Sequence, residues 1–413
     1  MVTRASSHMV VPRYPTPMGY ISLSELDQIQ PHRHSGVLVY LYKLTLKDTN
    51  FTEIIKNSLS LILVHHYRRT GQLRRIKDFA PTEAVMRDLY PNIDYDSPIE
   101  TWSLLIVQVI VQVTRFSCGG LCLVVKASHV VLDGWALCKL ICSWAKLAQG
   151  ECLGKVQIPL HDRTCLLSCR EPKGLKFRAS SFDHRPFKAP PLLLGCSDNQ
   201  AAEINKETSL AILKFTKEQV QQLKRKASEN SNGDKKLAEG RPCITYEAVA
   251  AHIWRCACMA RRNDSHQPTA MRFIANIRSR LNPKLPSNYA GNGIFQMWTE
   301  VCLSEDIIRN PLSFATNKIR EALENLTDEY VRSAMDFMAN LENVDRLRRD
   351  GSPMGIPTDD GKAFVIPSAS DDGSAIVILR LQTKCIEAFR KLCYEGIPLL
   401  PEDPADQSCK PQA

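Results

Sequence analysis

The stretch Ser128-His129-Val130-Val131-Leu132-Asp133-Gly134-Trp135 joins two apolar segments of different periodicity. It follows a strand-like apolar run over residues 121–125 and precedes residues 136–141, whose apolar spacing predicts a helix. His129 is therefore predicted at a strand-to-helix junction, where a side chain can reach the mouth of a cleft and Gly134 lets the backbone turn tightly. This is a suitable place for a general base, because neutral imidazole accepts protons near neutral pH.

Taken alone, the spacing of His129 and Asp133 is also typical of a buried His with a satisfied hydrogen bond. The functional interpretation depends on further landmarks that follow one another along the chain. Those before the junction are Pro15-Thr16-Pro17, Leu23-Ser24-Glu25-Leu26-Asp27-Gln28, Gly71-Gln72-Leu73 and Asp78-Phe79-Ala80-Pro81-Thr82. Those after it are Asp162-Arg163-Thr164, Pro190-Pro191-Leu192-Leu193-Leu194-Gly195, Asn276-Ile277-Arg278-Ser279-Arg280, Tyr289-Ala290-Gly291-Asn292 and Asp360-Gly361-Lys362.

In this order the landmarks resemble those of the plant BAHD acyltransferases, CoA-thioester-dependent enzymes with a His-x-x-x-Asp-Gly motif. They are most similar to the branch that transfers hydroxycinnamoyl groups to spermidine or shikimate. The resemblance implies an α/β fold of two similar domains, each a mixed β-sheet with flanking helices, with a channel between them. It also implies acyl-CoA and a small-molecule acceptor as partners, and no permanently bound cofactor.

The resemblance assigns a role to each candidate site residue. His129 is the expected general base, which removes a proton from the acceptor as it attacks the thioester. Asp133 is expected to turn away from the channel and pair with Arg278 in a bidentate contact that holds the turn; alternatively, Arg278 and Arg280 are surface charges. Thr245, at a predicted helix start, is the expected CoA contact, although a helix cap without a ligand is the alternative.

Composition agrees with a cytosolic enzyme. The chain has 413 residues, of which 44% are hydrophobic and 23% are charged, and its formal charge of +9 comes without a nucleic-acid-binding motif. Basic clusters such as residues 224–226 are interpreted as solvated faces.

The fifteen cysteines show no metal-binding spacing and suit reduced thiols, so no metal is expected. Neither a signal peptide nor a membrane helix is predicted, and we expect a cytoplasmic monomer.

The length predicts two domains. Residues 1–174 form the expected N-terminal domain with the His motif, and their apolar runs at 37–40 and 104–107 predict strands. Residues 175–199, rich in Pro, Lys and Ser, are the expected crossover linker, and residues 200–413 form the C-terminal domain. In that domain, Thr216 and Thr245 are each expected to cap a helix.

Two departures from the family pattern leave alternatives open. A strand pair that usually follows Gly71-Gln72-Leu73 is reduced to residues 74–77, and the Asp-Phe-Gly-Trp-Gly motif is absent where residues 350–358 stand. The chain is therefore interpreted as an active acyltransferase, as a non-catalytic or defective relative, or as a shikimate-type O-acyltransferase. A condensation-type or chloramphenicol-acetyltransferase-like domain fits less well, because its doubled His is replaced by Ser128. The Arg that holds shikimate in relatives falls in the missing segment, so a spermidine-like polyamine is the favoured acceptor.

Overall fold

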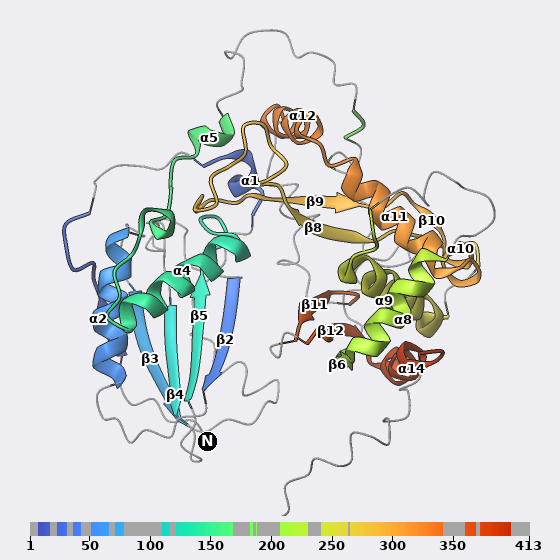
Figure 1. Ribbon diagram of the computed structural model, residues 1–413, viewed down its shortest axis with the longest axis horizontal. Coiled ribbons are helices and arrows are strands. Elements are labelled where there is room, and N and C mark those ends of the chain that lie inside the picture. The colour runs from blue at the N-terminus through green and yellow to red at the C-terminus, as the bar shows by residue number, and fades with distance from the viewer. Residues whose placement is uncertain are drawn as a thin grey trace, which may run out of the picture. The chain divides into compact units, whose positions relative to one another are not determined.

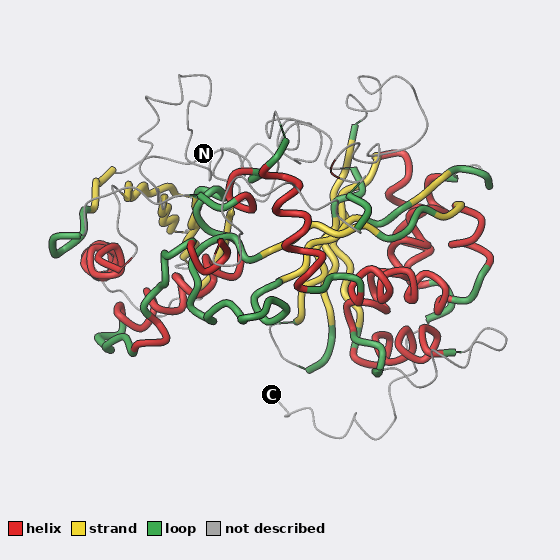
Figure 2. Tube along the Cα trace, turned by 90° about the horizontal axis from the view of Figure 1, so that it is seen from above, coloured by secondary structure: helices red, strands yellow, loops and turns green. Residues whose placement is uncertain are grey.

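The computed structural model divides into two compact units. Unit 1 comprises Met1–Phe187, Asn276–Phe295 and Thr327–Met354, and unit 2 comprises Lys188–Ala275, Gln296–Leu326 and Gly355–Ala413. The residues that the structure describes are 7–16, 23–30, 36–42, 51–65, 71–77, 110–115, 121–167, 182–184, 187, 207–229, 241–262, 265–341, 360–368 and 372–397. Both units contain helices and strands (Figure 2), so the mixed α/β class is confirmed.

Unit 1 is built on a five-stranded mixed sheet with the order β1-β3-β4-β5-β2. Its strands are β1 (Ser7–Val10), β2 (Gly36–Tyr42), β3 (Gly71–Lys77), β4 (Ile110–Arg115) and β5 (Leu121–Ala127). The β3–β4 pair is parallel and the other pairs are antiparallel. In β5 the consecutive residues Cys122 to Val125 are all buried, as in a strand covered on both faces. The strands predicted at 37–40 and 121–125 are confirmed, whereas 104–107 lies outside the described residues.

Two helices of unit 1 carry most of its core. α2 (Phe51–His65) and α4 (Gly134–Ala148) pack side by side (Figure 1). The buried residues of α4 recur with helical spacing, which confirms the predicted helix: Ala136, Leu137, Leu140, Ile141 and Trp144. They share one apolar cluster with residues of β5 and α2. The remaining helical segments of unit 1 are α1 (Glu25–Gln28), the 3-10 turn η1 (Lys155–Gln157), α5 (Thr164–Leu167) and α12 (Asp328–Ala339).

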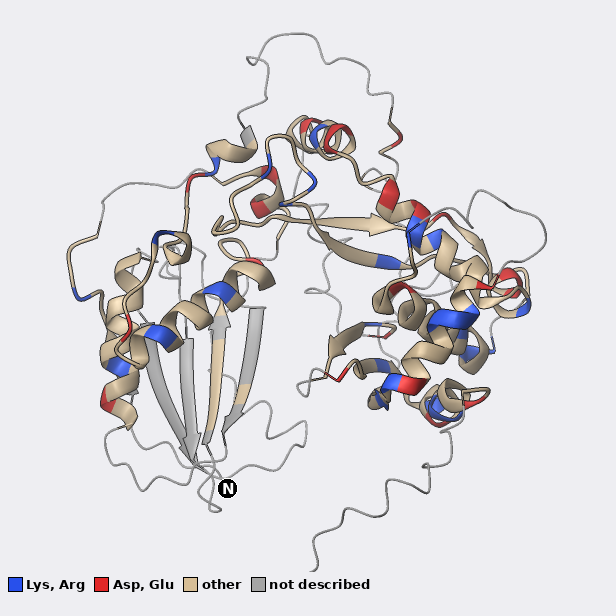
Figure 3. Cartoon of the chain, in the orientation of Figure 1, with Lys and Arg blue, Asp and Glu red and all other residues tan. Residues whose placement is uncertain are grey.

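Unit 2 surrounds the helix α9 (Thr245–Arg261), which is buried along most of its length. The helices that pack on it are α8 (Lys217–Ser228), α10 (Ser304–Arg309), α11 (Leu312–Glu324) and α14 (Thr383–Tyr394). The predicted cap of α8 is confirmed, because the Thr216 hydroxyl accepts from the N–H of Gln219 at 3.3 Å. The basic cluster at 224–226 lies on α8, one of the helices with blue segments in Figure 3; Lys224 is half-buried and Arg225 and Lys226 are exposed.

The sheet of unit 2 has the order β11-β12-β6, with antiparallel pairs. Its strands are β6 (Thr208–Phe215), β11 (Ala363–Pro367) and β12 (Ala375–Gln382). Burial alternates along β6 and β12, so that one face packs on the helices. β11 is an outer strand whose Phe364 and Ile366 are 53% and 42% exposed. This sheet therefore presents apolar side chains on its outer strand.

The chain passes between the units through the paired strands β8 (Arg272–Asn276) and β9 (Ile294–Trp298). The segment Asn276–Phe295 that joins them belongs to unit 1, although it falls within the predicted domain 200–413. Those predicted domain limits, 1–174 and 200–413, stay a prediction. The short pair β7 (Pro268–Thr269) and β10 (Cys302–Leu303) completes unit 2. In the part of the chain that the structure describes, no helix has both the length and the apolar character to cross a membrane.

Candidate active site

His129 lies in the turn between β5 and α4. The N–H groups of Val131 and Leu132 both donate to the Ser128 carbonyl oxygen at 3.2 Å, which closes the turn. The imidazole is half-buried, and its Nδ1 atom has no hydrogen-bond partner among the described residues. In a Ser-His-Asp triad, this nitrogen would donate to a carboxylate. The described part of the chain therefore supplies no triad partner, and the orientation of the ring depends on the turn.

Asp133 is fully buried and begins α4 as its cap. Its Oδ1 atom accepts from the N–H of Ala136 at 2.8 Å, and its Oδ2 atom accepts from the N–H of Gly293 at 2.9 Å. The guanidinium of Arg278 donates to both oxygens, with 2.7 Å from Nη1 to Oδ2 and 3.1 Å from Nη2 to Oδ1. The expected bidentate pair is thus present, and it ties the start of α4 to the segment Asn276–Phe295.

Arg278 also fastens the loop that follows it. Its Nη2 atom donates to the carbonyl oxygens of Tyr289 at 3.1 Å and Gly291 at 2.8 Å, and its guanidinium lies 5.6 Å from the centre of the Tyr289 ring. Gly293 is required by this packing, because a Cβ atom there would lie 2.7 Å from Cζ of Arg278. The alternative that Arg278 is a surface charge is therefore wrong: its side chain is 5% exposed.

The predicted role of Gly134 is not supported by the structure. Gly134 is the first residue of α4 and its φ lies outside the left-handed region. A Cβ atom built there would meet nothing within 4 Å. The chain enters α4 from this turn through its cap residue Asp133, which adopts an extended φ of −81° and ψ of 175° that any residue can reach. A glycine is consequently not needed for the backbone to turn at this point.

Three further residues contact the His129 turn or each other. Asn292 donates to the carbonyl oxygen of His129, Arg163 donates to that of Val131, and both bind the carboxylate of Asp27. All three belong to the landmark motifs of the sequence, which assign them no role. A local pattern cannot pair residues 27, 163 and 292, so their place in the motifs was the only available signal.

Thr245 is the first residue of α9, and Ile244 rather than Thr245 occupies the capping position. The expectation that Thr245 caps the helix is therefore wrong by one residue. The reason is Glu247, three residues after Ile244, whose carboxylate accepts from the N–H of Ile244 at 3.1 Å. Thr245 itself is half-buried. Its contact with CoA stays a prediction.

Glu247 forms an ion-pair group at the same helix end. Its fully buried carboxylate accepts from the guanidinium groups of Arg241 and Arg320, the latter at 3.3 Å. Burial alone would raise the pKa of Glu247, but hydrogen bonds from Arg241 and the Ile244 N–H lower it below its usual value. The pKa of Arg241 is raised by the same hydrogen bond. Among the described residues, this is the cluster of charge nearest in sequence to Thr245.

Known proteins resemble this chain over most of its length. A family model described as the transferase family matches residues 1–80 and 70–356. Hydroxycinnamoyl-CoA:piscidic acid hydroxycinnamoyltransferase of Actaea racemosa is 32% identical, over 96% of this chain and 100% of the relative. The chain belongs to the BAHD acyltransferase family. A second relative of this BAHD acyltransferase, shikimate O-hydroxycinnamoyltransferase of Nicotiana tabacum, is 30% identical over 94% of this chain and 98% of the relative.

Solved structures show the same fold. The crystal structure of vinorine synthase has a TM-score of 0.64 with 18% identity, covering 94% of this BAHD acyltransferase and 96% of that chain. F. sporotrichioides TRI101 complexed with coenzyme A and T-2 has a TM-score of 0.64 with 14% identity, covering 90% and 97%. The alignment with the Actaea racemosa relative spans 466 positions, more than the 413 residues of this chain. That relative therefore carries stretches that this chain lacks.

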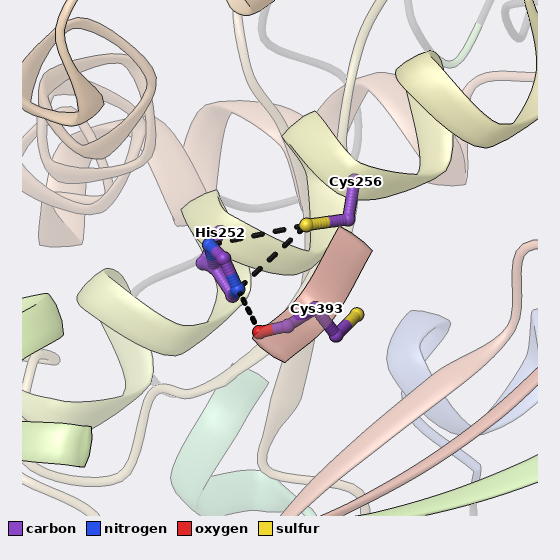
Figure 4. A group of neighbouring side chains, drawn as sticks. All are labelled: His252, Cys256 and Cys393. Atoms are coloured by element: carbon purple, nitrogen blue, oxygen red, sulfur yellow. Dashed lines mark hydrogen bonds between the residues drawn. The ribbon is translucent and has the colours of Figure 1, made fainter. Parts of the chain in front are cut away.

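One group of side chains in the described residues has the composition of a metal site. His252 and Cys256 of α9 lie beside Cys393 of α14, all buried, with potential ligand atoms within 4.8 Å of one another (Figure 4). The Nε2 atom of His252 already contacts the Cys393 carbonyl oxygen at 2.8 Å. The Cys256 sulfur lies 3.9 and 3.7 Å from the two ring nitrogens, so it packs along the ring edge or face rather than in line with one lone pair. This geometry is that of a packed core.

Proposed function

We propose that this acyltransferase moves a hydroxycinnamoyl-type group from acyl-CoA to an amine or hydroxyl acceptor, with His129 as the general base. His129 takes the proton from the acceptor while the acceptor nitrogen or oxygen attacks the thioester carbonyl carbon. The carbon–sulfur bond of the resulting tetrahedral intermediate then breaks. The CoA thiolate leaves and is protonated, the acyl group stays on the acceptor, and no acyl-enzyme forms.

The observation that supports this role is the fixed turn around a half-buried imidazole. Asp133 is occupied by Arg278, Ala136 and Gly293, so its carboxylate secures the turn instead of the ring. The His129 imidazole is then left to exchange a proton with the substrate. Burial of the Asp133–Arg278 pair makes this support sensitive to loss of either partner, because the remaining charge would be buried alone.

The donor is proposed to be an acyl-CoA that contacts the region of Thr245. This rests on the family and on solved structures of similar fold that are complexed with coenzyme A. No permanently bound cofactor is proposed. We further propose a cytoplasmic monomer whose partners are acyl-CoA and a small acceptor, without nucleic acid or membrane.

For the acceptor, we propose a spermidine-like polyamine. The basis is the similarity of the opening motifs and of residues 190–195 to the spermidine branch, together with the absence of the segment that holds the shikimate carboxylate in relatives.

A second candidate is an acceptor that carries a carboxylate. The relatives' names support it, since they specify piscidic acid, shikimate and anthranilate. Each of these acceptors combines a hydroxyl or amine with a carboxylate group. The acceptors of these relatives therefore favour the second candidate, a shikimate-type O-acyltransferase.

One competition experiment separates the candidates. Purified protein is given p-coumaroyl-CoA with equal concentrations of spermidine and shikimate, and the products are identified by mass while thiol release is followed. A polyamine amide as the main product is expected. An ester of shikimate as the main product would reverse the acceptor assignment and leave acyl transfer intact, whereas thiol release with neither product would mean that water takes the acyl group and would contradict transfer to either proposed acceptor.

A further inference from the structure

We propose that Asn292, oriented by Asp27, is a positioning residue for His129, and that Arg163 holds the other side of the same turn. The proposal rests on the proposed function in one respect, the role of His129 as general base. All four residues belong to unit 1.

Two carbonyl groups of the turn are held by side chains that are distant in sequence. The Nδ2 atom of Asn292 donates to the His129 oxygen at 2.8 Å. The Nη2 atom of Arg163 donates to the Val131 oxygen, also at 2.8 Å. The backbone on either side of Val130 is therefore held by two hydrogen bonds in addition to those that the Asp133–Arg278 pair makes.

Asp27 joins these two donors. Its fully buried carboxylate accepts on Oδ1 from Nδ2 of Asn292 at 2.8 Å and from the backbone N–H of Asn292 at 3.0 Å. Its Oδ2 atom accepts from Nε of Arg163 at 3.2 Å, and from the N–H and hydroxyl of Ser24 at 3.0 and 2.8 Å. The Asp27 carboxylate in α1 thus positions both side chains that bind the turn, Asn292 and Arg163.

The chemistry of the contacts fixes the direction of the Asn292 amide. Its neighbours, the Asp27 carboxylate and the His129 carbonyl, are both acceptors, so the NH₂ group must face them. The opposite end, Oδ1, is buried and has no hydrogen-bond partner among the described residues. Aspartate has the same shape but offers no donor and would place a second negative charge beside Asp27. An uncharged hydrogen-bond donor is therefore favoured over a carboxylate at this position.

The consequence for catalysis follows from the free Nδ1 atom of His129. Because no described side chain holds that nitrogen, the backbone of residue 129 sets the direction of the imidazole. A displacement of ~1 Å in a reacting group can lower a rate by ~100-fold. Asn292 contacts this backbone and lies where it can act on the base without itself taking part in proton transfer.

The first test compares Asn292→Ala with a matched control. Asn292→Ala is expected to lower kcat by about 10- to 100-fold with KM for the acyl-CoA changed less than about twofold, and Asn292→Asp is expected to lower kcat further. The control is Asn288→Ala, which removes a partly exposed amide of the same loop that donates to the Ile158 carbonyl at 2.7 Å. Its kcat is expected to match the parent, and parent-like kcat in both Asn292 variants would overturn the proposal.

The second test asks whether Asn292 acts through His129. In a His129→Ala background, Asn292→Ala is expected to cause little further loss, since the base to be positioned is gone. The same fold-loss in both backgrounds would overturn the positioning role. Loss of rate in His129→Ala with parent-like kcat in Asn292→Ala overturns the positioning role alone. A parent-like rate in His129→Ala instead contradicts the proposed function.

Thermal melting of each variant accompanies the kinetics. If Asn292→Ala does not melt cooperatively, Asn292→Ser replaces it, because serine removes the amide donor to the His129 carbonyl while leaving a polar hydroxyl in the buried space. A kcat between those of the parent and His129→Ala, with a pH profile of the parent's shape, is expected for Asn292→Ser. A parent-like kcat in this folded variant would overturn the proposal.

Discussion

At the scale of single residues, His129 depends on groups that are far away in sequence. Arg278, Asn292 and Arg163 reach the turn from 145, 163 and 32 residues away, counted to their bonded partners. The imidazole itself has no such support at Nδ1 among the described residues. Replacing His129 and replacing a residue that holds its turn should therefore have different effects on turnover and stability.

Replacing the base should affect turnover more than binding. A positioned general base contributes ~100- to 10,000-fold, so His129→Ala is expected to lower kcat by that order while the affinity for the acyl-CoA changes little. The measurements are steady-state kinetics and calorimetric titration with the CoA ester. His266→Ala, an exposed His of unit 2, is the control and should keep the parent kcat. Turnover of His129→Ala at the parent rate would mean that another group takes the proton.

The Asp133–Arg278 pair should show strong coupling. Removing one partner of a buried ion pair costs ~3–5 kcal/mol because the other charge is left buried, so Asp133→Asn and Arg278→Ala should each lower both the melting temperature and kcat. The double variant should lose much less than the sum. Arg280→Ala, an exposed neighbour, should behave like the parent. Fully additive losses would contradict the coupling.

At the scale of elements, the start of α9 depends on one carboxylate. Glu247 has a lowered pKa in the folded state, so it contributes stability that is complete above its unfolded pKa of ~4.3 and is lost as pH falls through the lower folded value. Glu247→Gln should therefore lower the melting temperature at pH 7 and flatten its fall in acid. Glu387→Gln, in an exposed pair, should change little. An acid profile of Glu247→Gln identical to the parent's would contradict this role.

Elements were predictable from the sequence where local rules decide them. Local patterns predicted the strand β5, the helix α4 and the Thr216 cap of α8. Each of these features depends on residues that are close together in the sequence. The helix α9 was also predicted, but its capping residue is Ile244 instead of Thr245, because Glu247 accepts from the Ile244 N–H. The partners of Asp27 could not be predicted, since nothing local links Asp27 to Asn292. The pair of Asp133 and Arg278 was expected only through the family resemblance.

At the scale of the whole molecule, the missing Asp-Phe-Gly-Trp-Gly segment should limit stability. The expected gap, residues 350–358, lies outside the described residues, but β11 beyond it is an outer strand with exposed Phe364 and Ile366. Every ~100 Å² of apolar surface left exposed costs about 2.5 kcal/mol, against a total of only ~5–15 kcal/mol. Exposed apolar edges also favour aggregation. We therefore expect a marginally stable protein with weak turnover.

Grafting tests this expectation. Inserting the family's segment between Arg349 and Asp360 should raise the melting temperature and kcat/KM for the CoA ester. An unrelated Gly/Ser insert of equal length at the same place is the control and should raise neither. If the graft improves neither quantity and the parent already melts cooperatively with normal turnover, the residues now in the gap complete the fold by themselves.

The placement of Asn276–Phe295 in unit 1 has a consequence for how the chain is made. At ~5–20 residues per second, on the order of ten seconds separate the synthesis of Asp133 from that of Arg278 and Gly293. During that interval the nascent chain holds two carboxylates, Asp27 and Asp133, whose buried sites have no complete set of donors. The turn around His129 therefore cannot complete its hydrogen bonds until residues 276–295 have been synthesised. A separate polypeptide of residues 1–174 would lack Arg278, Asn292 and Gly293, which hold this turn.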